Sequence, residues 1–249
     1  MKPFLIVTDL DSTLVHPEAF LSLAKFNNFF KKHRDNYGSK LVYATGRSLK
    51  LYQDLESEVD LLPPDRLITS VGSEIYTADK QMDSNWATHL SEDWDVEIVS
   101  QIACEYKELE LQPESEQGDF KVSFLLKPEY KAILADLKQE LNAKNIKAQV
   151  IYSSDKDVDV LPERSGKGKA LSYVREALGL PCDRTVACGD SGNDITLFAE
   201  NTFGIIVGNA RPELIAWYEA NKRDNLYLSN RRYAAGILDG LRHFGWMDV

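Results

Sequence analysis

Short apolar runs alternate with segments of helical apolar spacing at both ends of the chain. Strand-like runs cover residues 4–11, 40–47 and 66–76, and amphipathic helices are expected between them over 19–34 and 48–62. After residue 164 the alternation returns, with strands expected over 185–190 and 203–208 and helices over 167–179, 194–201, 211–221 and 234–245. This alternation predicts an α/β fold, a Rossmann-like parallel sheet with crossover helices.

The middle of the chain has a different pattern. Helices are expected over 91–109 and 129–145, and strands with only partial alternation over 120–127 and 147–154. These strands need not continue the first sheet. We therefore expect an inserted α+β module over residues 79–160, with residues 1–78 and 161–249 forming the core.

Composition narrows the class of protein. The 249 residues are 43% hydrophobic and 27% charged, as in ordinary globular proteins, and the net charge of −10 argues against nucleic acid or an anionic membrane as partner. We expect no membrane span and no signal segment. Three cysteines without a CxxC pair suit reduced thiols in the cytoplasm, and four scattered histidines argue against zinc.

Polar residues gather where the expected strands end. They are Asp9 and Asp11, then Thr45, Gly46 and Arg47, then Gly72, Ser73 and Glu74, and finally the run Gly189 to Asp194. Ligands of an open parallel sheet bind beyond these carboxyl ends. The chain has neither a Walker A motif nor a GxGxxG after a strand, which argues against a nucleotide-cofactor fold.

These residue types suit phosphate chemistry. Paired carboxylates suit Mg²⁺, while a hydroxyl and an ammonium can hold phosphate oxygens. One aspartate could attack phosphorus, and the other could serve as general acid and base. Asp9 and Asp11 could also merely cap a turn. Lys167 and Lys169 stand at a helix start, where the dipole disfavours cations, and this hints at a bound anion.

The motifs DLDST, ATGR, GKGKA and CGDSGND, in this order, resemble the four motifs of haloacid-dehalogenase-superfamily (HAD) phosphatases. The insertion lies between the second and third motifs, where that superfamily carries its larger cap domains. Longer segments, among them SVGSEIY, KDVDVLPERSGKGKAL and GNARPELIAWY, are similar to sucrose-phosphate phosphatases. The resemblance spans nearly the whole chain and implies a HAD-like core with an α+β cap.

The resemblance implies a role for each matching residue. Asp9 would be the nucleophile and Asp11 the general acid and base. Asp9, the main-chain carbonyl of Asp11 and Asp190 would hold Mg²⁺, supported by Asp194. Thr45 and Lys167 would hold the phosphate, although the sequence leaves open whether Lys167 or Lys169 faces it. The remaining expected substrate contacts are Gly46, Arg47, Ser73, Glu74, Lys121, Ser123, Lys156, Asp157 and Asn193.

The expected reaction is Mg²⁺-dependent hydrolysis of sucrose 6-phosphate through an aspartyl-phosphate, the last step of sucrose biosynthesis, with sucrose-phosphate synthase as an expected partner. Three alternatives stay open. The chain could hydrolyse another sugar phosphate, such as mannosyl-phosphoglycerate. It could be a phosphomutase with the same nucleophile. It could also be a non-catalytic module that binds a sugar phosphate or a synthase.

Overall fold

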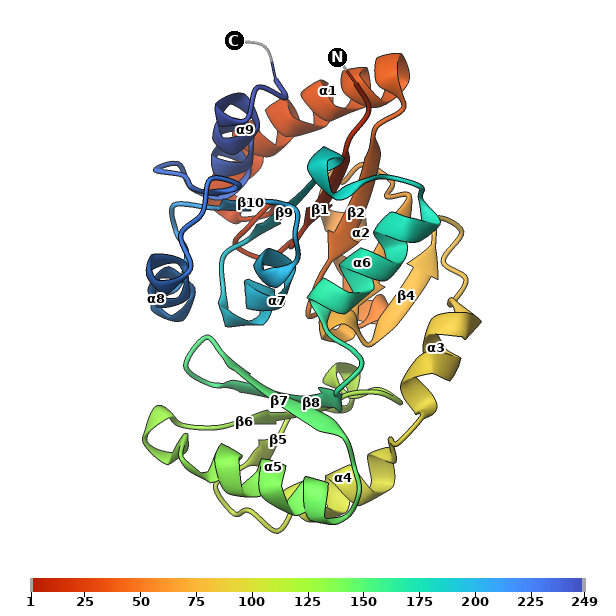
Figure 1. The fold of residues 1–249 in the computed structure, drawn as a ribbon, viewed down its shortest axis with the longest axis vertical. Coiled ribbons are helices and arrows are strands. Elements are labelled where there is room, and N and C mark those ends of the chain that lie inside the picture. The colour runs from red at the N-terminus through yellow and green to blue at the C-terminus, as the bar shows by residue number, and fades with distance from the viewer. Residues whose placement is uncertain (1, 248–249) are drawn as a thin grey trace.

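The computed structural model describes residues 2–247, which form two sheets and the helices that pack on them (Figure 1). The strands of the larger sheet are β1 Leu5–Thr8, β2 Lys40–Ala44, β3 Arg66–Thr69, β4 Glu74–Thr77, β9 Thr185–Gly189, β10 Phe203–Ile206 and β11 Leu226–Leu228. Their order is β11-β10-β9-β1-β2-β3-β4, and all neighbours are parallel except β3 and β4. The predicted α/β architecture with a mostly parallel sheet is confirmed.

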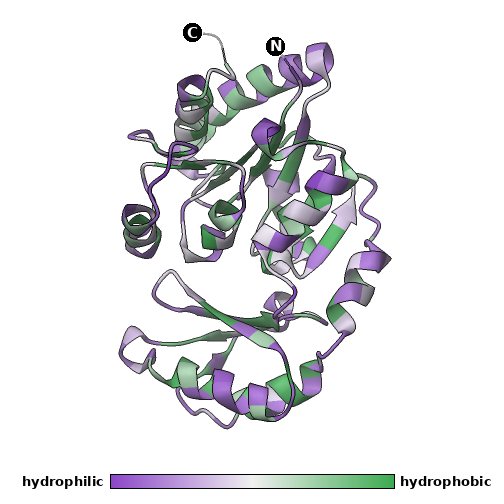
Figure 2. Ribbon diagram, viewed as in Figure 1, coloured by the Kyte–Doolittle hydropathy of each residue, from purple (hydrophilic) through white to green (hydrophobic). Residues whose placement is uncertain are grey.

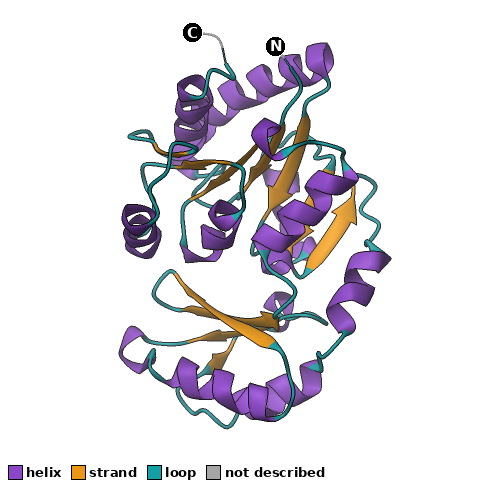
Figure 3. Ribbon diagram, in the orientation of Figure 1, coloured by secondary structure: helices purple, strands orange, loops and turns teal. Residues whose placement is uncertain are grey.

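Helices cover both faces of this sheet (Figure 3). They are α1 Phe20–Tyr37, α2 Leu49–Glu58 and α9 Tyr233–His243 on one face, and α3 Ser84–Ser91, α6 Lys167–Ala177, α7 Ile195–Ala199 and α8 Pro212–Ala220 on the other. Central strand β1 is buried along its whole length, with Ile6 in one hydrophobic cluster and Leu5 and Val7 in the other. Burial on both faces explains why this strand has a continuous apolar run rather than an alternating one.

The smaller sheet is antiparallel and has a hydrophobic cluster of its own. Its strands are β5 Glu110–Leu111, β6 Val122–Leu125, β7 Ala148–Ser153 and β8 Asp157–Pro162, in the order β5-β6-β8-β7. Helices α4 Val96–Ala103 and α5 Ile133–Ala143 pack on one face, where Val99, Leu137 and Val158 belong to the same hydrophobic cluster. The other face is turned toward the larger sheet (Figure 1). Figure 2 shows hydrophobic and hydrophilic stretches alternating along the helices of both parts of the molecule.

Helix α3 lies between the two sheets in sequence but packs on the larger one. Trp86 and Leu90 join its hydrophobic cluster, and the indole nitrogen of Trp86 donates to the carbonyl of Gly72 at 3.3 Å. The smaller sheet ends with β8 at Pro162. The proposed boundaries at residues 79 and 160 stay predictions, and the packing of α3 favours a start of the inserted module nearer residue 92.

Two expected elements are wrong. Residues 66–76 form a hairpin of β3 and β4 rather than one strand, because Val71 (φ 58°) and Gly72 (φ 91°) adopt left-handed backbone conformations that reverse the chain. Residues 91–109 do not form one helix, because α3 ends at Ser91 and Asp95 starts α4 afresh by accepting hydrogen bonds from the backbone nitrogens of Glu97 and Ile98. Strands β5, β8 and β11 were not expected from the sequence.

No helix among residues 2–247 has the length and apolar character that a membrane crossing needs. The cysteines Cys104, Cys182 and Cys188 are all free thiols.

Gly72 touches the backbone at the start of α6. A Cβ on Gly72 would lie 2.3 Å from the carbonyl carbon of Gly166 and 2.5 Å from the nitrogen of Lys167. Gly72→Ala should therefore lower the free energy of unfolding by the cost of left-handed backbone, about 1–2 kcal/mol, plus about 1–3 kcal/mol for crowding.

Gly179→Ala is the matched control, because Gly179 has φ 68° but no atom within 4 Å of the added Cβ. Its free energy of unfolding should fall only by the cost of the left-handed backbone, about 1–2 kcal/mol. Urea denaturation of both variants measures the difference, and equal losses would show that the contact between Gly72 and α6 is not tight.

Candidate active site

The candidate site lies at the carboxyl ends of strands β1, β2 and β9. Asp9 and Asp11 follow β1, Thr45 follows β2, and Asp190 follows β9. The parallel pairing of β1 with β9 places Thr8 opposite Cys188, and the backbone nitrogen of Asp9 donates to the carbonyl of Cys188 at 2.9 Å. Residues from distant parts of the chain therefore meet at one edge of the sheet.

Three buried carboxylates form the centre of the site. Oxygens of Asp9, Asp190 and Asp194 all lie within 4.8 Å of one another. Burial, reinforced by the neighbouring carboxylates, raises the pKa of Asp9 to about 7 and that of Asp190 to about 8. Taking charged groups out of water disfavours their ionised form, so this cluster gains from a compensating cation.

Lys167 supplies one such cation. Its Nζ donates to Asp9 Oδ1 and Asp194 Oδ1, both at 2.7 Å, and to Asn193 Oδ1 at 3.0 Å. Burial alone would lower the pKa of Lys167, but the carboxylates of Asp194 and Asp9 raise it above its ordinary value. Lys169 instead donates to the carbonyl of Glu163. The structure therefore places Lys167, and not Lys169, at the site.

The cluster has the oxygen atoms that a divalent cation requires. Both carboxylate oxygens of Asp194 already accept hydrogen bonds, because Oδ1 accepts from Lys167 and Oδ2 accepts from the backbone nitrogens of Asp190 and Ser191. Thr13 Oγ1 donates to Asp190 Oδ1 at 3.0 Å. Within residues 2–247, no hydrogen bond reaches Asp9 Oδ2 or Asp190 Oδ2. Two free carboxylate oxygens beside an excess of negative charge fit a hard cation.

Asp11 points away from this cluster. Arg47 donates to both of its carboxylate oxygens, from Nε at 2.8 Å and from Nη2 at 2.7 Å, and also to the carbonyl of Leu51. The hydrogen bond to Asp11 raises the pKa of Arg47. The Asp11 side chain is 51% exposed, so water reaches it. The Asp11 carboxylate is thus held at the mouth of the site, beside the start of α2.

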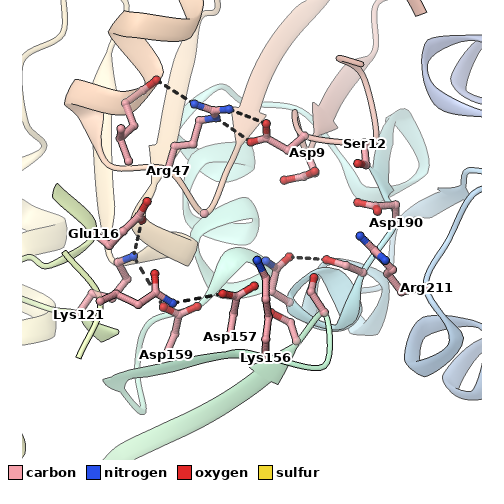
Figure 4. A pocket seen from close by; sticks show the side chains of 18 residues that line it. Asp9, Ser12, Arg47, Glu116, Lys121, Lys156, Asp157, Asp159, Asp190 and Arg211 are labelled. Carbon is pink, nitrogen blue, oxygen red and sulfur yellow. Dashed lines mark hydrogen bonds and ion pairs between the residues drawn. The ribbon is translucent and has the colours of Figure 1, made fainter. Parts of the chain in front are cut away.

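A cavity of about 430 Å³ opens between the carboxylates and the smaller sheet (Figure 4). Figure 4 shows Asp9, Asp190 and Arg47 on one side, with Lys121, Asp157 and Asp159 on the other. The lining residues are Asp9, Asp11, Ser12, Gly46, Arg47, Leu51, Gln112, Glu116, Lys121, Ser153, Ser154, Lys156, Asp157, Asp159, Asp190, Ser191, Asn193 and Arg211. Nearly all are polar, as in a site for a hydroxyl-rich ligand.

The core residues expected at the site fall into two groups. Gly46, Arg47 and Asn193 line the cavity, whereas Thr45 is buried behind it and accepts a hydrogen bond from the backbone nitrogen of Arg47 at 3.1 Å. Ser73 and Glu74 lie outside it. Ser73 donates to the carbonyl of Ser70, and Glu74 accepts from Thr69 Oγ1 and Tyr76 OH at the edge of a neighbouring groove.

The expected residues of the smaller sheet divide in the same way. Lys121, Lys156 and Asp157 line the cavity. Ser123 is fully buried and donates to Asp159 Oδ1 at 2.7 Å, so it orients a lining carboxylate instead of facing the cavity. The Nζ of Lys121 lies 3.7 Å from both Glu116 Oε2 and Asp159 Oδ1.

Several lining residues were missed in the sequence. They are Ser12, Leu51, Gln112, Glu116, Ser153, Ser154, Asp159, Ser191 and Arg211. A signal existed for Asp159, because residues 157–160 alternate strictly between aspartate and valine. Val158 and Val160 pack in the hydrophobic cluster while Asp157 and Asp159 face the cavity. Gln112 and Arg211 had no such pattern.

The chain is similar in sequence to one family of phosphatases. A profile of the sucrose-6F-phosphate phosphohydrolase family matches residues 2–245. The chain belongs to the sucrose-6F-phosphate phosphohydrolase family.

Solved structures agree with this family. A sucrose-phosphatase from Synechocystis sp. PCC6803, in complex with sucrose and phosphate, is 39% identical with a TM-score of 0.92, covering 98% of this chain and 99% of that one. A haloacid dehalogenase-like hydrolase from Bacillus subtilis shares only the fold, at 18% identity with a TM-score of 0.69, covering 98% of this chain and 99% of that one. The predicted HAD-like α/β fold is therefore confirmed.

Curated relatives differ in length. The probable sucrose-phosphatase 2 of Arabidopsis thaliana is 40% identical over 96% of this chain, yet the chain spans only 59% of that protein. The mannosylfructose-phosphate phosphatase of Agrobacterium fabrum is 32% identical, with 98% of each chain covered. The chain thus spans about three fifths of the plant relative and nearly all of the bacterial one.

The carboxylate cluster should bind a divalent cation. Asp190→Asn removes one charged oxygen from the cluster, so the dissociation constant for Mg²⁺ or Mn²⁺ should rise at least about tenfold, because even groups that only support metal ligands contribute this much. Asp183→Asn, an exposed aspartate before the other end of β9, is the charge-matched control. Isothermal titration calorimetry of both variants decides. Unchanged affinity in Asp190→Asn would place the cation elsewhere.

Proposed function

We propose that this protein hydrolyses sucrose 6-phosphate to sucrose and inorganic phosphate, with Mg²⁺ as cofactor. The observation that carries the proposal is the cavity itself. It joins a buried nucleophile candidate, Asp9, to a wall of hydroxyl-binding side chains on the smaller sheet. The Synechocystis relative, 39% identical over nearly the same length, binds sucrose and phosphate. A phosphate at the Asp9 end and a disaccharide at the other end fit this layout.

In the first step, an oxygen of Asp9 attacks phosphorus. The new bond joins Asp9 to phosphorus, and the bond between phosphorus and the sugar oxygen breaks. Asp11 gives its proton to that leaving oxygen, so sucrose departs as a neutral alcohol. Lys167 holds Asp9 at 2.7 Å and keeps its carboxylate in one orientation.

In the second step, water attacks the phosphorus of the aspartyl-phosphate. Asp11 takes a proton from this water, the bond between Asp9 and phosphorus breaks, and inorganic phosphate leaves. Both steps need Asp11 to leave Arg47 and turn inward, and its half-exposed position leaves room for that rotation. Thr45 and Lys167 remain the proposed phosphate-holding residues.

Mg²⁺ fits the proposed site because Asp9 and Asp190 offer free, hard oxygen ligands, with the main-chain carbonyl of Asp11 as the third proposed ligand. Bound there, the cation would neutralise the charge of the phosphate and of the carboxylates around it. Asp194 supports the site from behind by orienting the loop that carries Asp190.

A second candidate substrate is another disaccharide phosphate. The relative from Agrobacterium fabrum, a mannosylfructose-phosphate phosphatase, is 32% identical over 98% of this chain. Its name points to a fructose unit like that of sucrose, so the choice rests on the residues that line the sugar end of the cavity. The free thiols suit a cytoplasmic location, and a sucrose-phosphate synthase stays a predicted partner.

The nucleophile can be tested directly. Asp9→Asn should keep the fold and lower kcat at least about a thousandfold, because an amide is a poor nucleophile and loss of a nucleophile removes most of the rate enhancement. Phosphate release measures the rate, and thermal melting controls for folding. Retention of a tenth or more of wild-type kcat would assign the attack to another group.

The substrate can be tested by comparison. We expect kcat/KM for sucrose 6-phosphate at least about 100-fold above that for glucose 6-phosphate or fructose 6-phosphate, because polar groups left unpaired by a smaller sugar carry a cost. Lys156→Ala should reduce this preference more than it reduces hydrolysis of p-nitrophenyl phosphate. Lys144→Ala, an exposed lysine at the end of α5, is the matched control.

A higher kcat/KM for mannosylfructose phosphate than for sucrose 6-phosphate would select the second candidate. Equal efficiency on mono- and disaccharide phosphates would contradict both. Release of an isomeric sugar phosphate without free phosphate would indicate a phosphomutase, and binding without turnover a non-catalytic module.

A further inference from the structure

The two chain segments that connect the smaller sheet to the larger one lie on the same side of the molecule (Figure 1). The chain enters it through α3 and the following residues and leaves it after Pro162, close to Gly166. The turn between β7 and β8 lies at the opposite end, below α7 and α8 (Figure 1). The cavity lies between this attachment and the free turn. A contact at the turn therefore holds the end of the smaller sheet that is far from the chain connections, where Ser153, Ser154 and Lys156 line the cavity.

Glu213, in the first turn of α8, makes that contact. Its Oε1 accepts from the backbone nitrogen of Ser154 in the β7–β8 turn and from the backbone nitrogen of Gly192, both at 3.2 Å. Gly192 lies in the loop after β9 that carries Asp190 and Asp194, two carboxylates of the cluster, and this loop is called the catalytic loop below. One carboxylate oxygen thus joins the smaller sheet to the catalytic loop.

Among the residues that the structure describes, the hydrogen bond between Glu213 and Ser154 has no neighbouring polar contact of the same kind. Within the described residues 2–247, no other hydrogen bond and no ion pair joins residues 96–160 to residues 2–78 or 167–247. The backbone is shaped for it, since Ser154 and Asp155 have φ of 55° and 56° and so form the tight turn. A Cβ on Gly192 would lie 3.0 Å from Glu213 Cγ and 3.3 Å from the carbonyl oxygen of Tyr152, so the three segments are in close contact.

We propose that Glu213 is a positioning residue that fastens the β7–β8 turn to the catalytic loop and thereby sets the affinity for the sugar part of the substrate. Ser153, Ser154, Lys156 and Asp157 all line the cavity and all lie in or next to this turn. Releasing the turn would withdraw these side chains together. The inference rests on the proposed function, because it assigns these residues to a sugar.

The contact is not one of the hydrogen bonds that hold the carboxylate cluster. Asp9, Lys167 and Asp194 are held by hydrogen bonds within the larger sheet's own loops, and none of these bonds involves Glu213. Loss of Glu213 should therefore weaken binding of a sugar phosphate while leaving a small phosphate ester, which does not reach the turn, nearly unaffected.

Three variants of Glu213 test the proposal. Glu213→Ala should raise KM for sucrose 6-phosphate about tenfold, the effect of losing hydrogen bonds to a charged acceptor, with kcat within about twofold. Glu213→Asp keeps the charge but is too short to reach both nitrogens, so it should resemble alanine. Glu213→Gln keeps the accepting oxygen and should recover most of the affinity. Kinetics with p-nitrophenyl phosphate should change less than about twofold in all three.

Glu219→Ala is the matched control, because Glu219 is an exposed carboxylate on the same helix that pairs with Lys222. It should behave as wild type. An equal loss of kcat/KM on sucrose 6-phosphate and on p-nitrophenyl phosphate in Glu213→Ala would mean that Glu213 only supports the catalytic loop. A wild-type KM for sucrose 6-phosphate in both Glu213→Ala and Glu213→Asp would show that Glu213 has no role in binding the sugar. If glutamine fails to recover affinity, the charge matters and not the hydrogen bonds. Each of these outcomes overturns the proposal.

Hydrogen exchange provides a readout that needs no substrate. The amides of Ser154 and Gly192 should exchange about five- to tenfold faster in Glu213→Ala than in wild type or Glu219→Ala, since each loses its acceptor. Unchanged exchange would overturn the fastening contact. If wild type hydrolyses no sugar phosphate but exchange still responds as expected, the contact stands and the proposed function fails, so the two failures are distinguishable.

Discussion

The ion pairs of Lys167 are the interaction on which the site depends. One buried ammonium group serves Asp9 and Asp194, while Asp190 lies within the same cluster without contacting it. A buried charge without a partner is costly, and here a cluster of three carboxylates contains only one lysine, which pairs with two of them. The remaining negative charge supports the proposed cation site, and the shared lysine holds Asp9 beside it. Charge imbalance, rather than any single residue, gives the site its chemistry.

The fold meets this constraint through close backbone contacts. Lys167 stands at the start of α6, and the preceding Gly166 (φ 110°) touches Gly72 in the turn after β3. At Gly168, a Cβ would lie 2.2 Å from the carbonyl oxygen of Thr196 in α7. Glycines on both sides of Lys167 let α6 approach the sheet and α7 closely enough for its ammonium to reach Asp9 beyond β1. The turn that reverses β3 into β4 is part of the same packing.

The sequence predicted the strand ends well and the side-chain directions poorly. Continuous apolar runs located β1, β2 and β9, and polar residues after them located Asp9, Thr45 and Asp190. These patterns follow from burial of a parallel sheet on both faces. The directions in which side chains point were harder to predict. Nothing in GKGKA decides between Lys167 and Lys169, since the difference arises from how α6 packs on α7. Glu74 was expected at the site because it was placed with Gly72 and Ser73 at the end of the third strand, whereas the hairpin turns its side chain toward Thr69 and Tyr76, beside a neighbouring groove.

The charges along the cavity differ between its two ends, and this difference would orient the proposed phosphate ester. The net charge of −10 repels anions on average. The end of the cavity at the smaller sheet, where we propose that the sugar binds, has carboxylates of its own, Glu116, Asp157 and Asp159, with buried Lys121 among them. Carboxylates accept hydrogen bonds from sugar hydroxyls but repel phosphate.

At the other end, Lys167 and a cation held by Asp9 and Asp190 would reverse that sign. A sugar phosphate then has one favourable orientation, with its phosphate at Asp9 and its hydroxyls at the smaller sheet. Under the proposed function, the carboxylates at the smaller sheet would therefore disfavour the reversed binding mode by repelling a phosphate placed there.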